Sequence, residues 1–213
     1  TGTSTIQFRN DSRSCTVRNC IISGSSRSTS SGTIFISSTS LIVGNDNIKL
    51  IGNTIGAAGS NTPVHGIYAI GVSTVRENNN IVIDSNYVKD YFISDGSCAG
   101  INVVSNCPNI VISNNHFFQT VPRIKTGGSY HCAIRVTSSA MVTGNTIGGS
   151  TPSNAGVYTF TGVASSRIYP IYIATGATAT STITGNTIRN ISISGAMNGT
   201  TTSSCPFAAI YLG

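Results

Sequence analysis

One short pattern recurs along most of this chain. An apolar strand of alternating residues is followed by an asparagine and then by another apolar residue. The copies read IKLIGNTI (48–55), IVIDSNYV (81–88), IVISNNHF (110–117), AMVTGNTI (140–147) and STITGNTI (181–188). Their asparagines are Asn53, Asn86, Asn115, Asn145 and Asn186, at steps of 33, 29, 30 and 41 residues. Such spacing predicts structural units that stack on one another.

A second marker keeps a similar period. Short strands begin at Ile34, Ile67, Ile101, Ile134, Ile171 and Ile210, at steps of 33, 34, 33, 37 and 39 residues. Periods of roughly 20–50 residues are typical of solenoids. Because helix formers are scarce and Ser, Thr, Asn, Gly, Ile and Val dominate, the sequence predicts an all-β solenoid. We expect about six coils of roughly 33 residues in one domain spanning 1–213.

The repeated asparagines are predicted to form a structural ladder. A turn asparagine can bond backbone groups and the asparagines of the coils above and below, and it tolerates left-handed backbone angles. In the first copy, CTVRNCII (15–22), Cys20 takes this place. We therefore assign Asn53, Asn86, Asn115, Asn145 and Asn186 to structure and not to an active site.

These patterns carry a resemblance to a known family. The GI-x-V…N-x-x-I-x-I-x-x-N-x-I repeat resembles the right-handed parallel β-helix repeats of the pectate-lyase-like superfamily. The Thr/Ser-rich copies GNTIGG (144–149) and GNTIRNIS (185–192) are similar to repeat regions of large secreted bacterial surface proteins. The resemblance implies a right-handed parallel β-helix. It implies no single function, because this fold hosts lyases, glycosidases, phage tailspikes and passive adhesins.

The charge and the hydrophobicity of the chain limit the classes of partner that it can bind. There are 12 Lys or Arg residues and 6 Asp or Glu residues, so the formal net charge is +6. The basic residues are scattered without interleaved aromatics, which argues against nucleic acid. No apolar run approaches the roughly 20 residues of a membrane helix, so we expect no membrane insertion. The charge favours a weak attraction to acidic polysaccharide. We expect no cofactor.

Six cysteines suggest a disulfide. Cys98 and Cys132 lie at near-equivalent positions on adjacent coils, where stacked Cα atoms about 4.8 Å apart suit the roughly 4.4–6.8 Å span of a disulfide. We predict a Cys98–Cys132 bridge, with Cys15 and Cys20 as a second candidate pair. Cys107 and Cys205 have no equivalent cysteine in a neighbouring coil. No Cys or His spacing matches a metal site. A disulfide would imply an extracellular compartment.

Catalysis has weak support in the sequence. A glycosidase of this fold needs two carboxylates roughly 5–9.5 Å apart, and a lyase needs clustered carboxylates with a basic residue. Asp46 and Glu77 fall in corresponding turns, Asp90 and Asp95 share a loop, and the repeat places no basic residue beside either pair. A polysaccharide-active enzyme therefore remains the alternative, with these four acids and Arg123, Lys125 and His131 as its candidates.

Two features favour binding. The middle residue of each first strand should point outward, which predicts one stripe made of Phe35, Tyr68, Asn102, Arg135, Tyr172 and Tyr211. Aromatic faces can stack on sugar rings, although aromatics also favour strands for structural reasons and a partner chain could cover them. Three long excursions (119–131, 148–170 and 189–206) should leave one side of consecutive coils. The first carries Arg123, Lys125 and His131 as further binding candidates.

The leading hypothesis is a non-catalytic structural or adhesive β-solenoid at a cell surface, as a segment or subunit of a fibre or adhesin. The alternatives are the polysaccharide-active enzyme and a carbohydrate-binding, tailspike-like module. The outward stripes, including Val82, Val111 and Met141 on the second strands, predict lateral packing against a partner. Neither end of the chain carries a helix-like cap, so we also expect self-association or continuation into a longer column.

Overall fold

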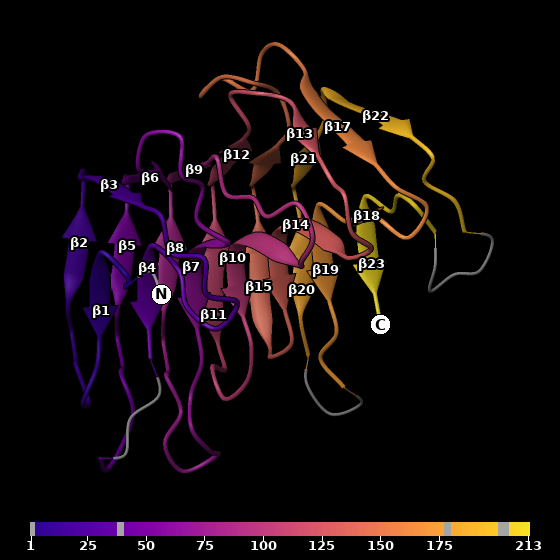
Figure 1. Cartoon of the computed structure of the whole chain (residues 1–213). Helices are drawn as coiled ribbons and strands as arrows, with labels where there is room; N and C mark the ends of the chain where they lie inside the picture. The colour runs from indigo at the N-terminus through magenta and orange to yellow at the C-terminus, as the bar shows by residue number, and fades with distance from the viewer. Residues whose placement is uncertain (1–2, 38–40, 177–179, 200–204) are drawn as a thin grey trace.

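The computed structural model describes residues 3–37, 41–176, 180–199 and 205–213. It is an all-β, parallel β-solenoid of about five turns, without a helix in the described residues, and close to the predicted six coils. The chain runs as a column from its N-terminal coil at the left of Figure 1 to its C-terminal coil at the right. In the described part of the chain, no helix is long and apolar enough to cross a membrane. The predicted fold class is therefore confirmed.

Three parallel sheets run along the column. The first contains the first strands of the repeat: β1 (Ile6–Phe8), β4 (Ile34–Ile36), β7 (His65–Ala69), β10 (Cys98–Val103), β14 (Tyr130–Val136), β19 (Ile171–Ile173) and β23 (Ile210–Leu212), with β18 (Arg167–Ile168) beside β14. The second contains the second strands: β2 (Thr16–Arg18), β5 (Lys49–Ile51), β8 (Val82–Asp84), β11 (Ile110–Ser113), β15 (Ala140–Thr143) and β20 (Thr182–Thr184).

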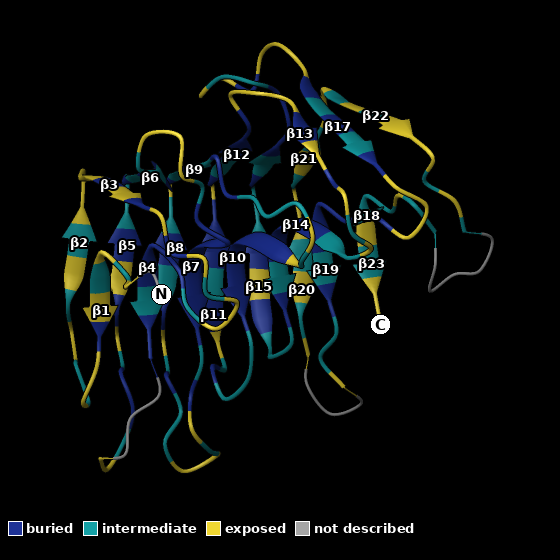
Figure 2. Cartoon of the chain, in the orientation of Figure 1, coloured by how far each residue is buried: buried dark blue, intermediate teal, exposed yellow. Residues whose placement is uncertain are grey.

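The third sheet follows the asparagine turn. It contains β3 (Ile21–Gly24), β6 (Thr54–Ala57), β9 (Tyr87–Lys89), β12 (His116–Phe118), β16 (Thr146–Ile147) and β21 (Thr187–Ile188). Between the three sheets lies one continuous apolar core of mainly Ile, Val, Leu and Phe side chains. The core forms because alternate side chains of each strand point inward. In β4, for example, Ile34 and Ile36 are buried while Phe35 stays half-exposed. Figure 2 shows the most completely buried strands in the middle coils.

A fourth sheet was not predicted. The three excursions form short parallel strands, β13 (Arg123–Ile124), β17 (Tyr158–Gly162) and β22 (Ile191–Gly195), which pair in that order. We call these three strands the side sheet. It lies over one side of the C-terminal half of the column (Figure 1). Phe160 is fully buried beneath it. The excursions therefore leave one side, as predicted, but they pack back onto the column; residues 200–204 of the third excursion lie outside the described residues.

The asparagines form a hydrogen-bonded ladder. The backbone N–H and Nδ2 of Asn53 both donate to Oδ1 of Asn86, at 2.9 and 3.0 Å. The same pair of bonds joins Asn86 to Asn115, Asn115 to Asn145, and Asn145 to Asn186. The left-handed residue of each turn is the one before the asparagine, as at Gly52 and Ser85. This explains the Gly-Asn pairs in the repeat, since glycine adopts such angles at little cost.

A second, shorter ladder was missed. The Ser12 N–H donates to Oδ1 of Asn45 at 2.9 Å, and the Asn45 N–H donates to Oδ1 of Asn78 at 2.8 Å. In the next coil Cys107 takes the asparagine position, and Nδ2 of Asn78 lies 3.8 Å from its Sγ. Burial raises the pKa of the Cys107 thiol to about 12. This ladder could not be recognised from the sequence, because only two of its three positions, Asn45 and Asn78, are asparagine and the third is Cys107.

Candidate functional site

The stripe on the first sheet is in register. Phe35 pairs with Tyr68, Tyr68 with Asn102, Asn102 with Arg135, Arg135 with Tyr172, and Tyr172 with Tyr211. Asn102 is shorter than both of its neighbours, so the stripe of large side chains is interrupted there. The result is a groove of about 430 Å³ on the outer surface of the column. We call it the Asn102 notch; it is lined by Thr29, His65, Tyr68, Ser97, Cys98, Asn102, Val104, Tyr130 and Arg135.

Arg135 supplies the positive charge of the notch. Its Nη1 donates to Oδ1 of Asn102 at 3.1 Å, and its guanidinium lies 5.4 Å from the ring centre of Tyr172. No carboxylate lines the notch in the part of the chain that the structure describes. The remaining guanidinium N–H groups can therefore donate to an oxygen-rich ligand, since an arginine fork matches carboxylate or sulfate oxygens.

His65 forms the neutral side of the notch. Its Nδ1 accepts the backbone N–H of Ala99 at 3.1 Å, so the proton is on Nε2, which lies 3.3 Å from the carbonyl oxygen of Thr29. Burial, with a smaller contribution from the nearby charge of Arg135, lowers the pKa of His65 to about 4. His65 is therefore neutral at physiological pH, and Arg135 is the cation in the notch.

Aromatic rings flank the notch on both sides. On one side, Phe35 and Tyr68 meet edge to face with ring centres 5.9 Å apart. On the other, Tyr172 and Tyr211 stack with centres 5.0 Å apart and planes 6° apart, and Tyr211 stacks on Tyr169 at 4.8 Å. Tyr68 is largely covered, whereas Tyr172 and Tyr211 are half-exposed. The half-exposed rings of the stripe are therefore Phe35 at its N-terminal end and Tyr172 and Tyr211 at its C-terminal end.

The candidate acids lie elsewhere. Asp46 lies 3.7 Å from Arg13 and accepts the N–H of Asn79. Asp90 is paired with Arg123, and Asp95 is exposed on its loop. Glu77 is half-buried in a turn. Neither of the predicted carboxylate pairs is placed at the notch.

The two basic loop residues lie below the surface. Arg123 is buried; its Nη2 lies 2.7 Å from Oδ1 of Asp90 and its Nε donates to Oε1 of Gln119 at 2.7 Å. Lys125 is also buried, and its Nζ donates to the carbonyl oxygen of Gly96 and to Oγ of Ser129. Both side chains are therefore buried beside the ring of Phe92 and not exposed, and their binding roles stay a prediction.

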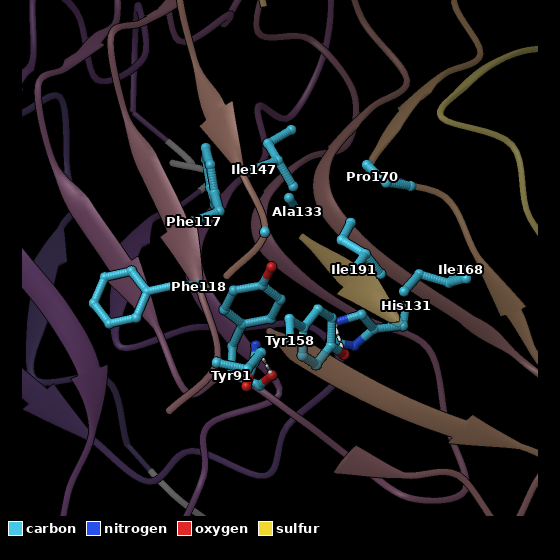
Figure 3. A pocket seen from close by; sticks show the side chains of 12 residues that line it. Tyr91, Phe117, Phe118, His131, Ala133, Ile147, Tyr158, Ile168, Pro170 and Ile191 are labelled. Carbon is cyan, nitrogen blue, oxygen red and sulfur yellow. Dashed lines mark hydrogen bonds between the residues drawn. The ribbon is translucent and has the colours of Figure 1, made fainter. Parts of the chain in front are cut away.

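His131 is buried in the same region. Its Nδ1 lies 3.1 Å from Sγ of Cys98, and its Nε2 lies 2.9 Å from the hydroxyl of Tyr158. The ring of Tyr91 stacks on it with centres 5.3 Å apart and planes 9° apart. Figure 3 shows His131 next to Tyr158, with Tyr91 nearby, beside a cavity of about 10 Å³ that has room for at most one water. His131 thus joins the column to the side sheet and does not reach a ligand at the surface.

The predicted disulfide is wrong. Cys98 pairs in register with His131, and Cys132 pairs with Ala99, so the two cysteines are offset by one residue. Successive side chains of a strand point to opposite faces. Cys98 accordingly contacts His131, whereas Cys132 packs with Ala99 and Tyr169. No disulfide joins any of the six cysteines, which all lie in the described residues, and this includes the pair Cys15 and Cys20.

Sequence reasoning found the stripe but not the notch. His65 and Tyr130 lie outside the three-residue first strands on which the stripe was built. The signal that was available is the single short side chain, Asn102, among large ones. The second outward stripe is present as well, with Val82 beside Val111 and Val111 beside Met141.

Comparison with known proteins gives no matching family model, no matching curated protein and no matching solved structure. The superfamily resemblance therefore rests on the sequence pattern and on the observed β-solenoid.

Proposed function

We propose that this chain is a non-catalytic, extracellular β-solenoid that binds a glycan across the Asn102 notch, as an adhesive part of a cell surface. The observation that carries the proposal is the notch itself. It is a hollow in a rigid sheet, with Arg135 and Asn102 at its base and tyrosines around it. Tyrosine rings stack on sugar faces, while an amide and a guanidinium bind sugar hydroxyls and acidic substituents.

The surroundings of Arg135 favour an acidic glycan over a neutral one. Its guanidinium contacts Asn102 and Tyr172, and neither contact neutralises its charge. His65 beside it stays uncharged. The ligand that this arrangement suits best is a saccharide whose carboxylate or sulfate group reaches Arg135. The extracellular assignment rests on the resemblance to secreted surface proteins and not on disulfides.

Affinity chromatography on an acidic polysaccharide and on a neutral one tests the proposal. Arg135→Gln should weaken retention on the acidic polymer about tenfold, the effect of about 1.4 kcal/mol. Tyr130→Ala should weaken retention on both polymers, because Tyr130 lines the notch and is half-exposed. The matched controls are Arg18→Gln and Tyr87→Ala, on the second and third sheets. Equal losses in the control variants would contradict a specific site, and no retention on either polymer would contradict glycan binding.

Self-association is the second candidate. A cavity of about 370 Å³ opens at the last described coil, lined by Ile173, Ile183 and Leu212 among others, and Leu212 is 68% exposed. Apolar side chains left open in this way favour packing of another coil. Sedimentation over a range of protein concentrations tests this candidate, because association through the last coil would raise the apparent mass with concentration. Leu212→Asp should then lower that mass, and an unchanged monomer at all concentrations would contradict it.

A further inference from the structure

The side sheet is attached to the column by an apolar contact that encloses one histidine. Tyr158, Phe160 and Ile168 form a small buried cluster with Phe92 packed against it, and Ile191 packs against both this cluster and the main core. His131 lies at the edge of the small cluster and is only 2% exposed. It makes one polar contact to β10, through Cys98, and one to β17, through Tyr158. The ring therefore connects the two layers directly.

The groups around this ring make a positive charge on it costly. The titratable groups that face it are Cys98 from β10, Tyr91 from the segment after β9, and Tyr158 from β17. The charged side chains of this region, Arg123 of β13 and Lys125 just after it, are both cationic. Asp90, which could balance them, is bonded to Arg123 and Thr120. In the described residues, no carboxylate contacts the His131 ring.

We propose that the side sheet is an acid-sensitive flap, which opens from the column when His131 takes up a proton. The neutral ring fits its site, because it is uncharged between a thiol, a phenol, the stacked ring of Tyr91 and the tilted ring of Phe160. An imidazolium there would be desolvated and repelled by Arg123 and Lys125. Opening brings the ring into water, where it is protonated freely, while the column keeps its ladder and its own core.

The direction of the pH dependence follows from the ring's environment. Burial, with Lys125 and Arg123 next, lowers the pKa of His131 well below 6.5 in the closed state. Above about pH 6.5 the ring is neutral in both states, and the flap keeps its full stability. Below that pH only the open state binds the proton. The open fraction then rises about tenfold for each pH unit, until the closed-state pKa is reached.

Hydrogen exchange of the whole chain, read strand by strand from about pH 7.5 to 4.5, tests the proposal. Because the column itself titrates through His65, the comparison of the two regions uses the His65→Gln variant. Its protection factors, corrected for the intrinsic exchange rate, should fall about tenfold per pH unit in β17, while those of β11 in the column stay constant over the first two units below pH 6.5. His131→Gln, which is neutral at every pH, should remove this dependence. His65→Gln, at a second buried histidine, should leave the β17 dependence intact.

Three results would overturn the proposal. They are constant protection of β17 down to pH 5, loss of protection in β17 and β11 together in the His65→Gln variant, and an unchanged pH dependence in His131→Gln. If His131→Gln leaves β17 unprotected even at pH 7.5, that variant cannot show a pH dependence. The proposal is then tested by measuring the pKa of the His131 ring in the wild-type protein by NMR. A ring pKa at or above 6.5 in the closed protein contradicts the flap, and a pKa well below 6.5 supports it.

Discussion

The middle coils of the column and the side sheet satisfy their buried polar groups in different ways. In the middle coils, each buried asparagine bonds its equivalent in the next coil, so one contact type serves every turn. In the side sheet, the polar contacts occur once each: Arg123 with Asp90, Lys125 with Ser129, and His131 with Tyr158. Repetition makes the column uniform, whereas the side sheet depends on single pairs.

This difference predicts how each region fails. A column with a continuous ladder loses stability when any interior rung is removed, because groups in two coils are left without partners. The side sheet should instead open as a unit, since its apolar cluster is small and shares only partly buried side chains such as Ile191 with the main core.

The largest effect is expected in the ladder. Asn86→Ala removes the acceptor for Asn53 and the donor to the carbonyl oxygen of Leu50, all in a region without solvent. Each buried group left unsatisfied costs about 1–3 kcal/mol, so the free energy of unfolding should fall by about 4 kcal/mol in urea titrations.

The matched control for this change is Asn186→Ala. Asn186 also accepts from the rung before it, at Asn145, but it is half-exposed in the last described coil. Water can replace part of what is lost, and the cost should be about half as large. Equal losses at the two positions would show that the ladder stabilises by something other than buried hydrogen bonds.

The ion pair of the side sheet comes next. Arg123→Met leaves the carboxylate of Asp90 partly buried with Thr120 as its remaining donor. Removing one partner of a buried pair costs about 3 kcal/mol. Because the pair lies at β13, protection from hydrogen exchange should be lost in β17 and kept in β11. Adding Asp90→Asn to this variant should recover part of the loss, and no recovery would place the cost in packing against Phe92 instead.

The column has its own acid-sensitive group, which sharpens the comparison with the side sheet. The pKa of His65 is lowered to about 4, mainly by burial. Its contribution to stability is complete above the unfolded pKa of about 6.5 and is lost as the pH falls toward 4. From pH 6.5 to 5 the column should lose about 2 kcal/mol of unfolding free energy, and His65→Gln should remove that slope. An unchanged slope in this variant would assign the acid sensitivity to another group.

Repetition also explains what could be predicted from the sequence. The strands, the register of the stripe and the line of Asn53, Asn86 and Asn115 were accessible because each position occurs several times. The side sheet was not, because its strands arise from loops of unequal length with no shared pattern. Burial of Lys125 and Arg123 could not be anticipated either, since charged residues in a loop are usually exposed. The notch depends on one short side chain, Asn102, whose effect appears only when its neighbours in space are known.

The smallest expected effect concerns the cysteines. It shows that two residues at near-equivalent positions of the repeat need not be paired across neighbouring strands. Cys98 and Cys132 occupy near-equivalent places in the repeat, yet the strands pair Cys98 with His131. Because the two cysteines are offset by one residue, their side chains do not face each other across the strand pair. Protein prepared without reductant should therefore have the same free energy of unfolding in urea as reduced protein, within about 0.3 kcal/mol.

Thiol counting after denaturation without reductant should accordingly find all six cysteines free. Peptide mapping of protein that never met a reductant provides the control. A linked Cys98–Cys132 peptide would require that β14 slides by one residue against β10, which would also separate Ile101 from Ile134 in the core. Such a slip would cost the column more than the bridge returns, because every inward side chain of β14 would turn outward. Finding that bridge would thus overturn the register on which both the Asn102 notch and the His131 contact depend.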